Sequence, residues 1–437
     1  MSSTMAVADL RVGIYIQLDG GWLSHPFPLS SFRIASEDQI HTLRGLGLRQ
    51  VRWVPEKSDL PEAPGEGADA VQPVAGMATP GAGNGKANQI ATPLKPASAT
   101  DPAHSRHQQA LQVQTEAARL CERQHGEATT AWRGATEAMV KRPREAGRIT
   151  EQLTRAILVK MLVGEDIGIR LVTSGCDRAA SHALNVSVIS LLIARALSLS
   201  EAELLDLGVG ALMHDIGKTE LPEGLRHLEE GFTDGAINAY REHVAKGVTL
   251  AQRMSLSAGA MRVVAQHHEL ADGSGFPLKL AGERLTMAAR VVALVNRYDN
   301  LCNPQTHTLA LTPHEAVSVL FAQGRQRYDT AVLNAFIRIM GVYPAGSLVQ
   351  LTDDRYAMVI GVNASRPLKP RVLVHESGVP RGEALLLDLE QHSDVGIRRS
   401  LPAAKLPPAV IDYLDPRPRV AYYFEPLALP VTEEMAA

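Results

Sequence analysis

"GALMHDIGKTELP", residues 210–222, decides how the rest of this chain is interpreted. An apolar helical run ends there on a histidine and an aspartate placed side by side, His214 and Asp215. A second stretch, "AQHHELADGSGFP", residues 265–277, places two histidines side by side before a glycine-rich turn. Consecutive residues on a helix point about 100° apart, so one ion would be poorly served by both members of a pair. The pattern therefore favours two metal ions, about 3.5–4 Å apart, that share a bridging ligand.

Histidines recur through the middle of the chain. The candidate metal ligands are His182, His214, Asp215, His243, His267 and His268. A lone histidine on a helix is more often a packed or surface side chain than a ligand, but the set as a whole favours a site. Imidazole and carboxylate ligands without thiolate suit Fe, Mn, Zn, Ni or Co. Two such ions can bind the non-bridging oxygens of a phosphodiester and activate the attacking nucleophile.

Lys218 stands four residues after His214, so it would face the same side if the helix continued for one more turn. Gly217 could end that helix first. A lysine there could neutralise charge in the transition state or protonate the leaving oxygen. The alternative is a solvated cation that is favoured by the helix dipole. Beside the histidine set, we favour the functional role.

Composition limits the class of protein. The chain has 437 residues, is 45% hydrophobic and carries a formal net charge of -3, so a multidomain protein is expected and no global field favours a nucleic-acid polymer or an anionic membrane. The three cysteines lack a C-x-x-C spacing and fit a reducing compartment. The N-terminus lacks the pattern of a signal peptide, and Ser190 and Arg195 interrupt the longest apolar stretch, so we expect no membrane span and a cytoplasmic protein.

Changes in composition predict the domain boundaries. Alternation in LRVGIYIQL and a strand-like RQVRWV flank a helix that begins with a capping box, Ser36 followed by Gln39. A Pro/Ala/Gly-rich stretch follows that is too poor in large apolar residues to order itself. The predicted parts are a small α+β module at 1–58, a disordered linker at 59–103, a connecting helix at 104–147, a helical phosphohydrolase domain at 148–341 and a small β domain at 342–437.

Helix signals run almost throughout the central region. Ser200 with Glu203 predicts a capping box, and Thr312 before Pro313 predicts an N-cap followed by proline in the first turn. Gly341 predicts a helix end. Beyond it, short apolar runs separated by turn residues are typical of β-strands.

The two quoted stretches resemble the HD-GYP family, a branch of the HD-domain metal-dependent phosphohydrolases, and the resemblance covers roughly residues 150–341. It implies an all-α bundle that hydrolyses cyclic di-GMP to linear pGpG or on to GMP with two or three metal ions. The stretch that begins at Leu10 is similar to the small module of unknown function often fused ahead of this domain.

The resemblance also implies roles for single residues. It makes the six candidate ligands metal ligands and Lys218 a catalytic or phosphate-contacting lysine. It makes Gly273, Gly275, Phe276 and Pro277 a loop on the substrate side. Arg290 is a further candidate phosphate partner, and it could equally pair with a structural carboxylate. We expect Glu269 to orient a histidine, and Asp272 either to brace the loop or to form a simple Asp-Gly turn.

Departures from the family pattern bear on catalysis. Asn296 stands where family members have an aspartate ligand, so that metal position keeps a carbonyl oxygen and loses a charge. Cys176 and Arg178 stand where trinuclear members have extra carboxylates, so we expect two divalent ions, Fe or Mn first. Phe276 lacks the hydroxyl of the family's tyrosine. Thr308 and Leu309 fall near the positions of a basic pair that holds substrate phosphates.

Two functions of different classes follow. The first is a metal-dependent cyclic di-GMP phosphodiesterase. The alternative is a degenerate relative that binds cyclic di-GMP, or a partner such as a cyclic di-GMP synthase domain, without turnover. Hydrolysis of another phosphodiester or cyclic dinucleotide is a third reading. We expect the modules on either side of the helical domain to receive a signal or to position that domain.

Overall fold

The computed structural model describes residues 3–18, 31–45, 48–58, 102–163, 167–173, 177–227, 231–324, 326–363, 366–392 and 394–426. The predicted linker lies outside these ranges, except for its last two residues, where a helix has already begun. The chain divides into two compact units, one N-terminal and one from Ala110 onward. Each unit is described by itself.

The N-terminal unit is a small α+β module, as the sequence predicts. Its antiparallel sheet has the order β1-β4-β2-β3 and is accompanied by one helix. The elements are β1 (Ser3–Ala6), β2 (Tyr15–Gln17), β3 (Ser31–Arg33), α1 (Glu37–Gly45) and β4 (Gln50–Trp53). The predicted strand around LRVGIYIQL is confirmed only in its second half, because the chain turns at Gly13, whose φ is 94°. The predicted capping box at the start of α1 is confirmed in one half: the Gln39 N–H donates to the Ser36 hydroxyl at 3.4 Å, while the Gln39 side chain accepts from the Ala35 N–H at 2.8 Å.

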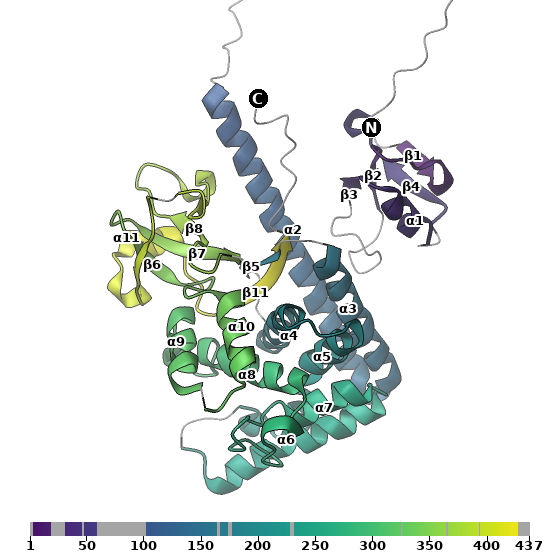
Figure 1. Ribbon diagram of the computed structural model, residues 1–437, viewed down its shortest axis with the longest axis vertical. Coiled ribbons are helices and arrows are strands. Elements are labelled where there is room, and N and C mark those ends of the chain that lie inside the picture. Colours follow the sequence, from purple (N-terminus) through teal and green to yellow (C-terminus); the bar gives the residue numbers. More distant parts are fainter. Residues whose placement is uncertain are drawn as a thin grey trace, which may run out of the picture. The chain divides into compact units, whose positions relative to one another are not determined.

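The second unit is mostly helical (Figure 1). Its helices are α2 (Pro102–Lys141), α3 (Pro143–Val163), α4 (Arg178–Ala196), α5 (Glu201–Met213), α6 (Asp234–Arg253), α7 (Ala258–Gln266), α8 (Met287–Cys302), α9 (Pro313–Gly324), α10 (Thr330–Met340) and α11 (Pro408–Leu414). Helix α4 lies in the middle, packed against α5, α8, α10 and a C-terminal strand. The predicted connecting helix is two helices, because α2 ends before Pro143 and α3 begins there.

An antiparallel sheet, formed mostly by the C-terminal part of the chain, packs against the bundle at α4 and α10. Its strands are β5 (Ile167–Val172), β6 (Leu348–Leu351), β7 (Tyr356–Asn363), β8 (Arg371–Val374), β9 (Leu387–Asp388), β10 (Ile397–Ser400) and β11 (Ala421–Pro426). The order is β10-β6-β7-β5-β11, with β8 paired to β7 and β9. Strand β5 lies within the span that the sequence analysis expected to be helical, and all six of its residues are buried. A fully buried strand has no alternation, so periodicity could not distinguish it from helix.

Three predicted helix boundaries are confirmed. The Ser200 hydroxyl and the Glu203 carboxylate form a complete capping box at α5. The Thr312 N–H donates to the Glu315 carboxylate at 2.9 Å ahead of α9. Gly341 closes α10 with a φ of +73°, a conformation that favours glycine.

Helix α4 passes a length and hydropathy test for a membrane-crossing helix, with a mean hydropathy of 1.3. It is the one such helix among the described residues, and 72% of that window is buried inside the protein. Its apolar character therefore serves the core of the bundle.

Gly210 permits a close contact between α5 and α7. A Cβ added at Gly210 would lie 2.5 Å from Val263 Cβ and 3.0 Å from the Ala260 carbonyl oxygen. We expect Gly210→Ala to lower the free energy of unfolding by about 1–3 kcal/mol through overpacking, measured by urea denaturation. The matched control is Gly134→Ala in α2, where nothing lies within 4 Å. That control should raise the free energy of unfolding by about 0.5–1 kcal/mol. Equal effects of the two changes would contradict this account of the packing.

Candidate metal centre

The HD pair sits where α5 ends. His214 follows the last residue of α5, and a short 3-10 helix, η4 (Ile216–Glu220), turns the chain. Gly217 allows that turn, because a Cβ there would collide with the backbone of His243 and Gly247 in α6. As a result Lys218 faces back onto the pair, and its Nζ lies 2.6 Å from Asp215 Oδ2. The α-helix does not continue to Lys218, so the condition for the predicted orientation fails, and the 3-10 turn places Lys218 beside Asp215 instead.

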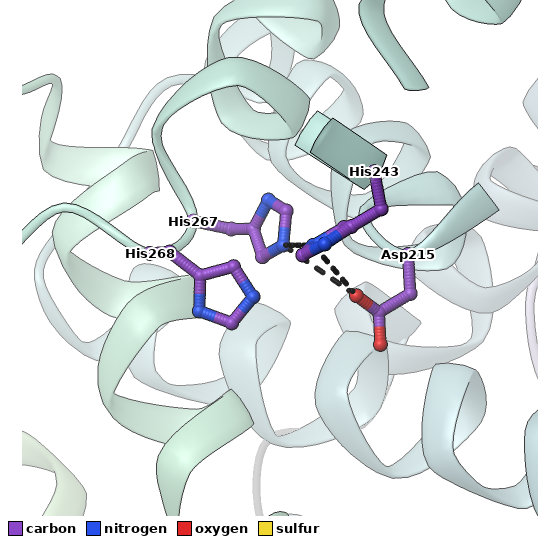
Figure 2. A group of neighbouring side chains, drawn as sticks. All are labelled: Asp215, His243, His267 and His268. Atoms are coloured by element: carbon purple, nitrogen blue, oxygen red, sulfur yellow. Dashed lines mark hydrogen bonds and ion pairs between the residues drawn. The ribbon is translucent and has the colours of Figure 1, made fainter. Parts of the chain in front are cut away.

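The Asp215 carboxylate lies between two groups of histidines. Its Oδ2 is 3.4 Å from Nε2 of both His182 and His214. Its Oδ1 is 3.6 Å from Nε2 of His243 and 3.5 Å from Nε2 of His267, as Figure 2 shows, with His268 beside them. Within each group the possible ligand atoms lie within 4.8 Å of one another. The structure thus brings all six predicted ligands of the His/Asp set together.

Hydrogen bonds fix which nitrogen of each ring faces the centre. Nδ1 of His214, His243 and His267 donates to the carbonyl oxygen three residues earlier, at 2.7, 2.6 and 2.8 Å. Each Nε2 then points inward with a free lone pair. For example, Nε2 of His243 and Nε2 of His267 face each other at 3.3 Å, each with its lone pair toward the centre. Two lone pairs at that distance repel unless a cation lies near them, so the arrangement suits a metal ion.

Two buried polar atoms strengthen this fit. Asp215 Oδ1 and His268 Nε2 are buried without a hydrogen-bond partner among the described residues. Burial lowers the pKa of His214 to about 4 and that of His243 to about 3, and it holds the pKa of His268 well below its usual value. These imidazoles are therefore neutral at pH 7, the form that binds a metal. The cluster has the properties of a metal site.

His182 is oriented differently. Its Nδ1 donates to Asp299 Oδ2 at 2.6 Å, and its Nε2 lies 3.1 Å from His214 Nε2. Burial alone would lower the pKa of His182, but Asp215 and Asp299 outweigh burial and raise it from 6.5 to about 9. Asp299 in turn accepts at Oδ1 from Asn185 and Asn303, at 2.7 and 2.9 Å. Asp299 therefore fixes the tautomer and the direction of a ligand.

The loop after the HH pair braces the site. The expected role of Glu269 is wrong: its carboxylate accepts from the backbone N–H groups of Leu278 and Leu280, at 2.6 and 2.9 Å, and does not orient a histidine. Asp272 accepts from the Ser274 N–H at 2.9 Å, which is the local turn that the sequence allowed. Gly275 packs so tightly on the HHE turn that an added Cβ would lie 2.5 Å from Glu269 Cα.

Phe276 stacks on a candidate metal ligand, His268. Its ring lies 4.4 Å from the His268 ring at an interplanar angle of 19°, and the Arg241 guanidinium lies 5.2 Å from its centroid. Of the four predicted loop residues Gly273, Gly275, Phe276 and Pro277, Gly275 and Phe276 lie against His268. None of them lines the cleft described next, and their contact with substrate stays a prediction.

A cleft of about 1090 Å³ opens onto the His182 side of the cluster. Four predicted site residues line it: His182, His214, Asp215 and Lys218. Other walls come from Trp132 of α2, from Arg178 at the start of α4, and from Arg417 and Arg419 just before β11. The indole N–H of Trp132 donates to the Leu212 carbonyl at 2.9 Å, which fixes the ring at the cleft.

Two predicted residues have other partners. The Arg290 guanidinium pairs with Asp329 at 2.7 Å and donates to the Gly282 carbonyl at 2.8 Å, so of the two alternatives the structural pairing is the one observed. Asn296 is buried in α8, and its Oδ1 accepts from Asn300 at 2.6 Å. Neither side chain lines the cleft.

Sequence reasoning missed several residues of the site. Asn185 and Asn303 are ordinary helix and loop asparagines in sequence, and their partner Asp299 lies three residues after Asn296 without a motif of its own. Tyr240 lies three residues before His243, and its ring is 5.4 Å from Lys218 Nζ. Helical spacing of three could have placed Tyr240 on the face of His243. No local pattern connects Arg419 with the metal ligands.

Known proteins resemble both parts of the chain. Residues 166–332 match the family model described as "HD domain", and residues 2–146 match the one described as "Domain of unknown function (DUF3391)". A cyclic di-GMP phosphodiesterase of Pseudomonas aeruginosa is 28% identical over 379 residues, which cover 86% of this chain and 85% of that protein. A cyclic di-GMP phosphodiesterase response regulator of Xanthomonas campestris is 31% identical over 150 residues, which cover 34% of this chain and 39% of that protein. A solved HD-GYP-type protein from Bdellovibrio bacteriovorus has 13% identity and a TM-score of 0.40, covering 77% of this chain and 98% of its own.

Metal binding at His182 should release a proton. Because the pKa of His182 is raised to about 9, the ring is protonated at pH 7 in the metal-free protein, and a metal must displace that proton. Apparent metal affinity should therefore rise with pH up to about 9 and level off above it. Titration calorimetry at pH 7 in two buffers of different ionisation enthalpy measures the proton release. His182→Gln should abolish this release, and a parent protein that releases no proton would contradict the assignment.

Proposed function

We propose that this chain, a member of the HD-GYP branch of the HD domain family, is a metal-dependent phosphodiesterase that hydrolyses cyclic di-GMP to linear pGpG, to GMP or to both. The observation that carries the proposal is the bridging position of Asp215, one carboxylate oxygen facing each group of imidazoles. Two-metal phosphodiesterases need such a shared ligand between their ions. The proposal is further supported by relatives named as cyclic di-GMP phosphodiesterases.

The ligand set supports two divalent ions. His182 and His214 with Asp215 would hold one, and His243, His267 and His268 with Asp215 would hold the other. Nitrogen and carboxylate ligands without thiolate favour Fe or Mn, with Zn, Ni or Co as the other metals this set accepts. When bound, such ions activate water and neutralise charge on a phosphate.

Lys218 and Asp215 are the proposed catalytic residues. Burial alone would lower the pKa of Lys218, but the Asp215 carboxylate and Tyr240 outweigh it and raise that pKa, so the ammonium is charged. Its Nζ faces the cleft beside the bridging carboxylate. A fixed cation there stabilises negative charge that develops on a phosphate or on the leaving oxygen.

Asn296 favours a second function, which is binding of cyclic di-GMP or of a partner protein such as a cyclic di-GMP synthase domain without turnover. Its amide is engaged with Asn300, and helix α8 supplies no carboxylate at that position. In this case the protein would bind metal and cyclic di-GMP but leave the phosphodiester intact. We propose a cytoplasmic location for either function. We also propose that the N-terminal module receives the signal that the second unit responds to.

Asp215→Asn tests the centre directly, because it keeps the shape of the side chain and removes the bridging charge. The protein should be purified with Fe or Mn under reducing conditions, its metal content measured per chain, and cyclic di-GMP followed by chromatography. We expect the variant to lose both bound metal and turnover. The control is Asp272→Asn, an exposed turn carboxylate, which should keep its metal. Full metal content in Asp215→Asn would show that Asp215 is not a ligand.

Lys218→Gln separates catalysis from metal binding. Lys218 is not in either ligand group, so metal content should stay within about a factor of two of the parent. We expect kcat to fall about 100-fold or more, the usual effect of removing a group that stabilises transition-state charge. Unchanged kcat with the metal in place would remove Lys218 from the catalytic residues.

A further inference from the structure

The cleft contains more positive charge than its own carboxylates neutralise. The cations that line it are Arg133, Arg178, Lys218, Arg226, Arg417 and Arg419. Its carboxylates are already engaged, since Asp177 pairs with Arg133 at 2.6 Å, Asp215 with Lys218 and Asp299 with His182. Arg417 pairs with Asp415 outside the cleft at 3.2 Å, and Arg226 donates to the Leu221 carbonyl at 3.1 Å.

Arg226 also has no ion pair among the described residues, but the two guanidinium groups whose charges act on each other are those of Arg178 and Arg419. Among the described residues, neither has a carboxylate within ion-pair distance. Burial first and the nearby Arg419 second lower the pKa of Arg178, which places two like charges close together. Such convergence is unfavourable in the free protein and becomes favourable when an anion binds between the two groups.

The half-buried Arg178 is held in place by neutral partners. Its Nη1 contacts the ring nitrogens of His227, at 3.0 and 3.1 Å, and donates to the Gln305 side chain. Burial and then the charge of Arg178 lower the pKa of His227 to about 4, so that ring is neutral and accepts. The contacts fix the guanidinium through one nitrogen without neutralising its charge. The planar fork keeps further donors for a ligand.

Arg419 is positioned by the residue that follows it. The Val420 carbonyl accepts from Asn185 at 3.1 Å and from Asn303 at 2.9 Å, and the Val420 N–H donates to Asn303 Oδ1 at 2.9 Å. Asn185 and Asn303 also hold Asp299, the partner of His182. One hydrogen-bond network therefore fixes both a metal ligand and the backbone that carries Arg419.

We propose that Arg178 and Arg419 form a second phosphate-binding position, which holds the non-scissile phosphodiester of a cyclic dinucleotide while the other phosphodiester lies at the metal cluster. A cyclic dinucleotide carries two phosphates across its ring, and the cleft offers positive charge at two places, Lys218 and this arginine pair. The inference rests on the proposed function and adds to it the residues that bind the second phosphate of the substrate. It assigns the second phosphate to Arg178 and to the C-terminal segment, elements on which the HD and HH motifs do not lie.

The test compares two substrates in the metal-loaded full chain. Cyclic di-GMP has two phosphodiesters, and bis(4-nitrophenyl) phosphate has one and needs only the metal cluster. We expect Arg178→Gln and Arg419→Gln each to lower kcat/KM for cyclic di-GMP about 10-fold or more, mainly through KM, since each removes a charge-assisted hydrogen bond. With bis(4-nitrophenyl) phosphate, kcat/KM should stay within about twofold. The dissociation constant of cyclic di-GMP from the metal-free protein should rise by a similar factor.

Arg398→Gln is the matched control. Arg398 lies on β10, is exposed and pairs with Asp354 away from the cleft, so neither substrate should be affected. Arg419 is exposed as well, so its replacement does not disturb the core. Parent-like KM and binding of cyclic di-GMP in both cleft variants would overturn the arginine site, and so would an equal loss with both substrates. A parent that neither binds nor hydrolyses cyclic di-GMP would overturn the proposed function and this inference with it.

Discussion

The Asp215 carboxylate, placed between two groups of imidazoles, is the interaction on which the rest of the site depends. Each oxygen faces a different group, and Oδ1 is buried with no hydrogen-bond partner in the part of the chain that the structure describes. Burying this carboxylate beside the neutral imidazoles of His214, His243 and His268 is costly unless cations compensate it. Lys218 supplies part of that charge, and metal ions at the two groups would supply the rest.

The bundle is arranged so that these side chains meet. Gly217 lets η4 pack directly on α6, and Gly210 lets α5 pack on α7, so the ends of α5 and α7 bring His214 and His267 to the same point. The backbone carbonyl three residues earlier then holds each ring. Two of the candidate metal ligands, His214 and His267, are therefore held at helix ends, where the last turn of the helix fixes the ring.

The C-terminal part of the chain belongs to the same unit as the bundle. Strand β11 pairs along its whole length with β5, which comes from the segment between α3 and α4. Val420, at the entry to β11, is bound by the asparagines that hold Asp299. The sheet thus contributes to the walls of the cleft as well as to the core, a role that the composition of residues 342–437 did not suggest.

By itself, the sequence determined the helical core, its caps and the candidate ligand set, because these depend on local spacing: HD at the end of one helix, HH at the end of another, a capping box at Ser200 and an N-cap at Thr312. It could not determine that Glu269 binds backbone, that Arg290 pairs with Asp329, or that Arg178 and Arg419 converge. The partner of a side chain can lie far away in the chain, as Arg170 and Glu425 illustrate, which pair across a separation of 255 positions. Only the tertiary structure decides those contacts, because they depend on how helices and strands pack and not on which helices and strands form.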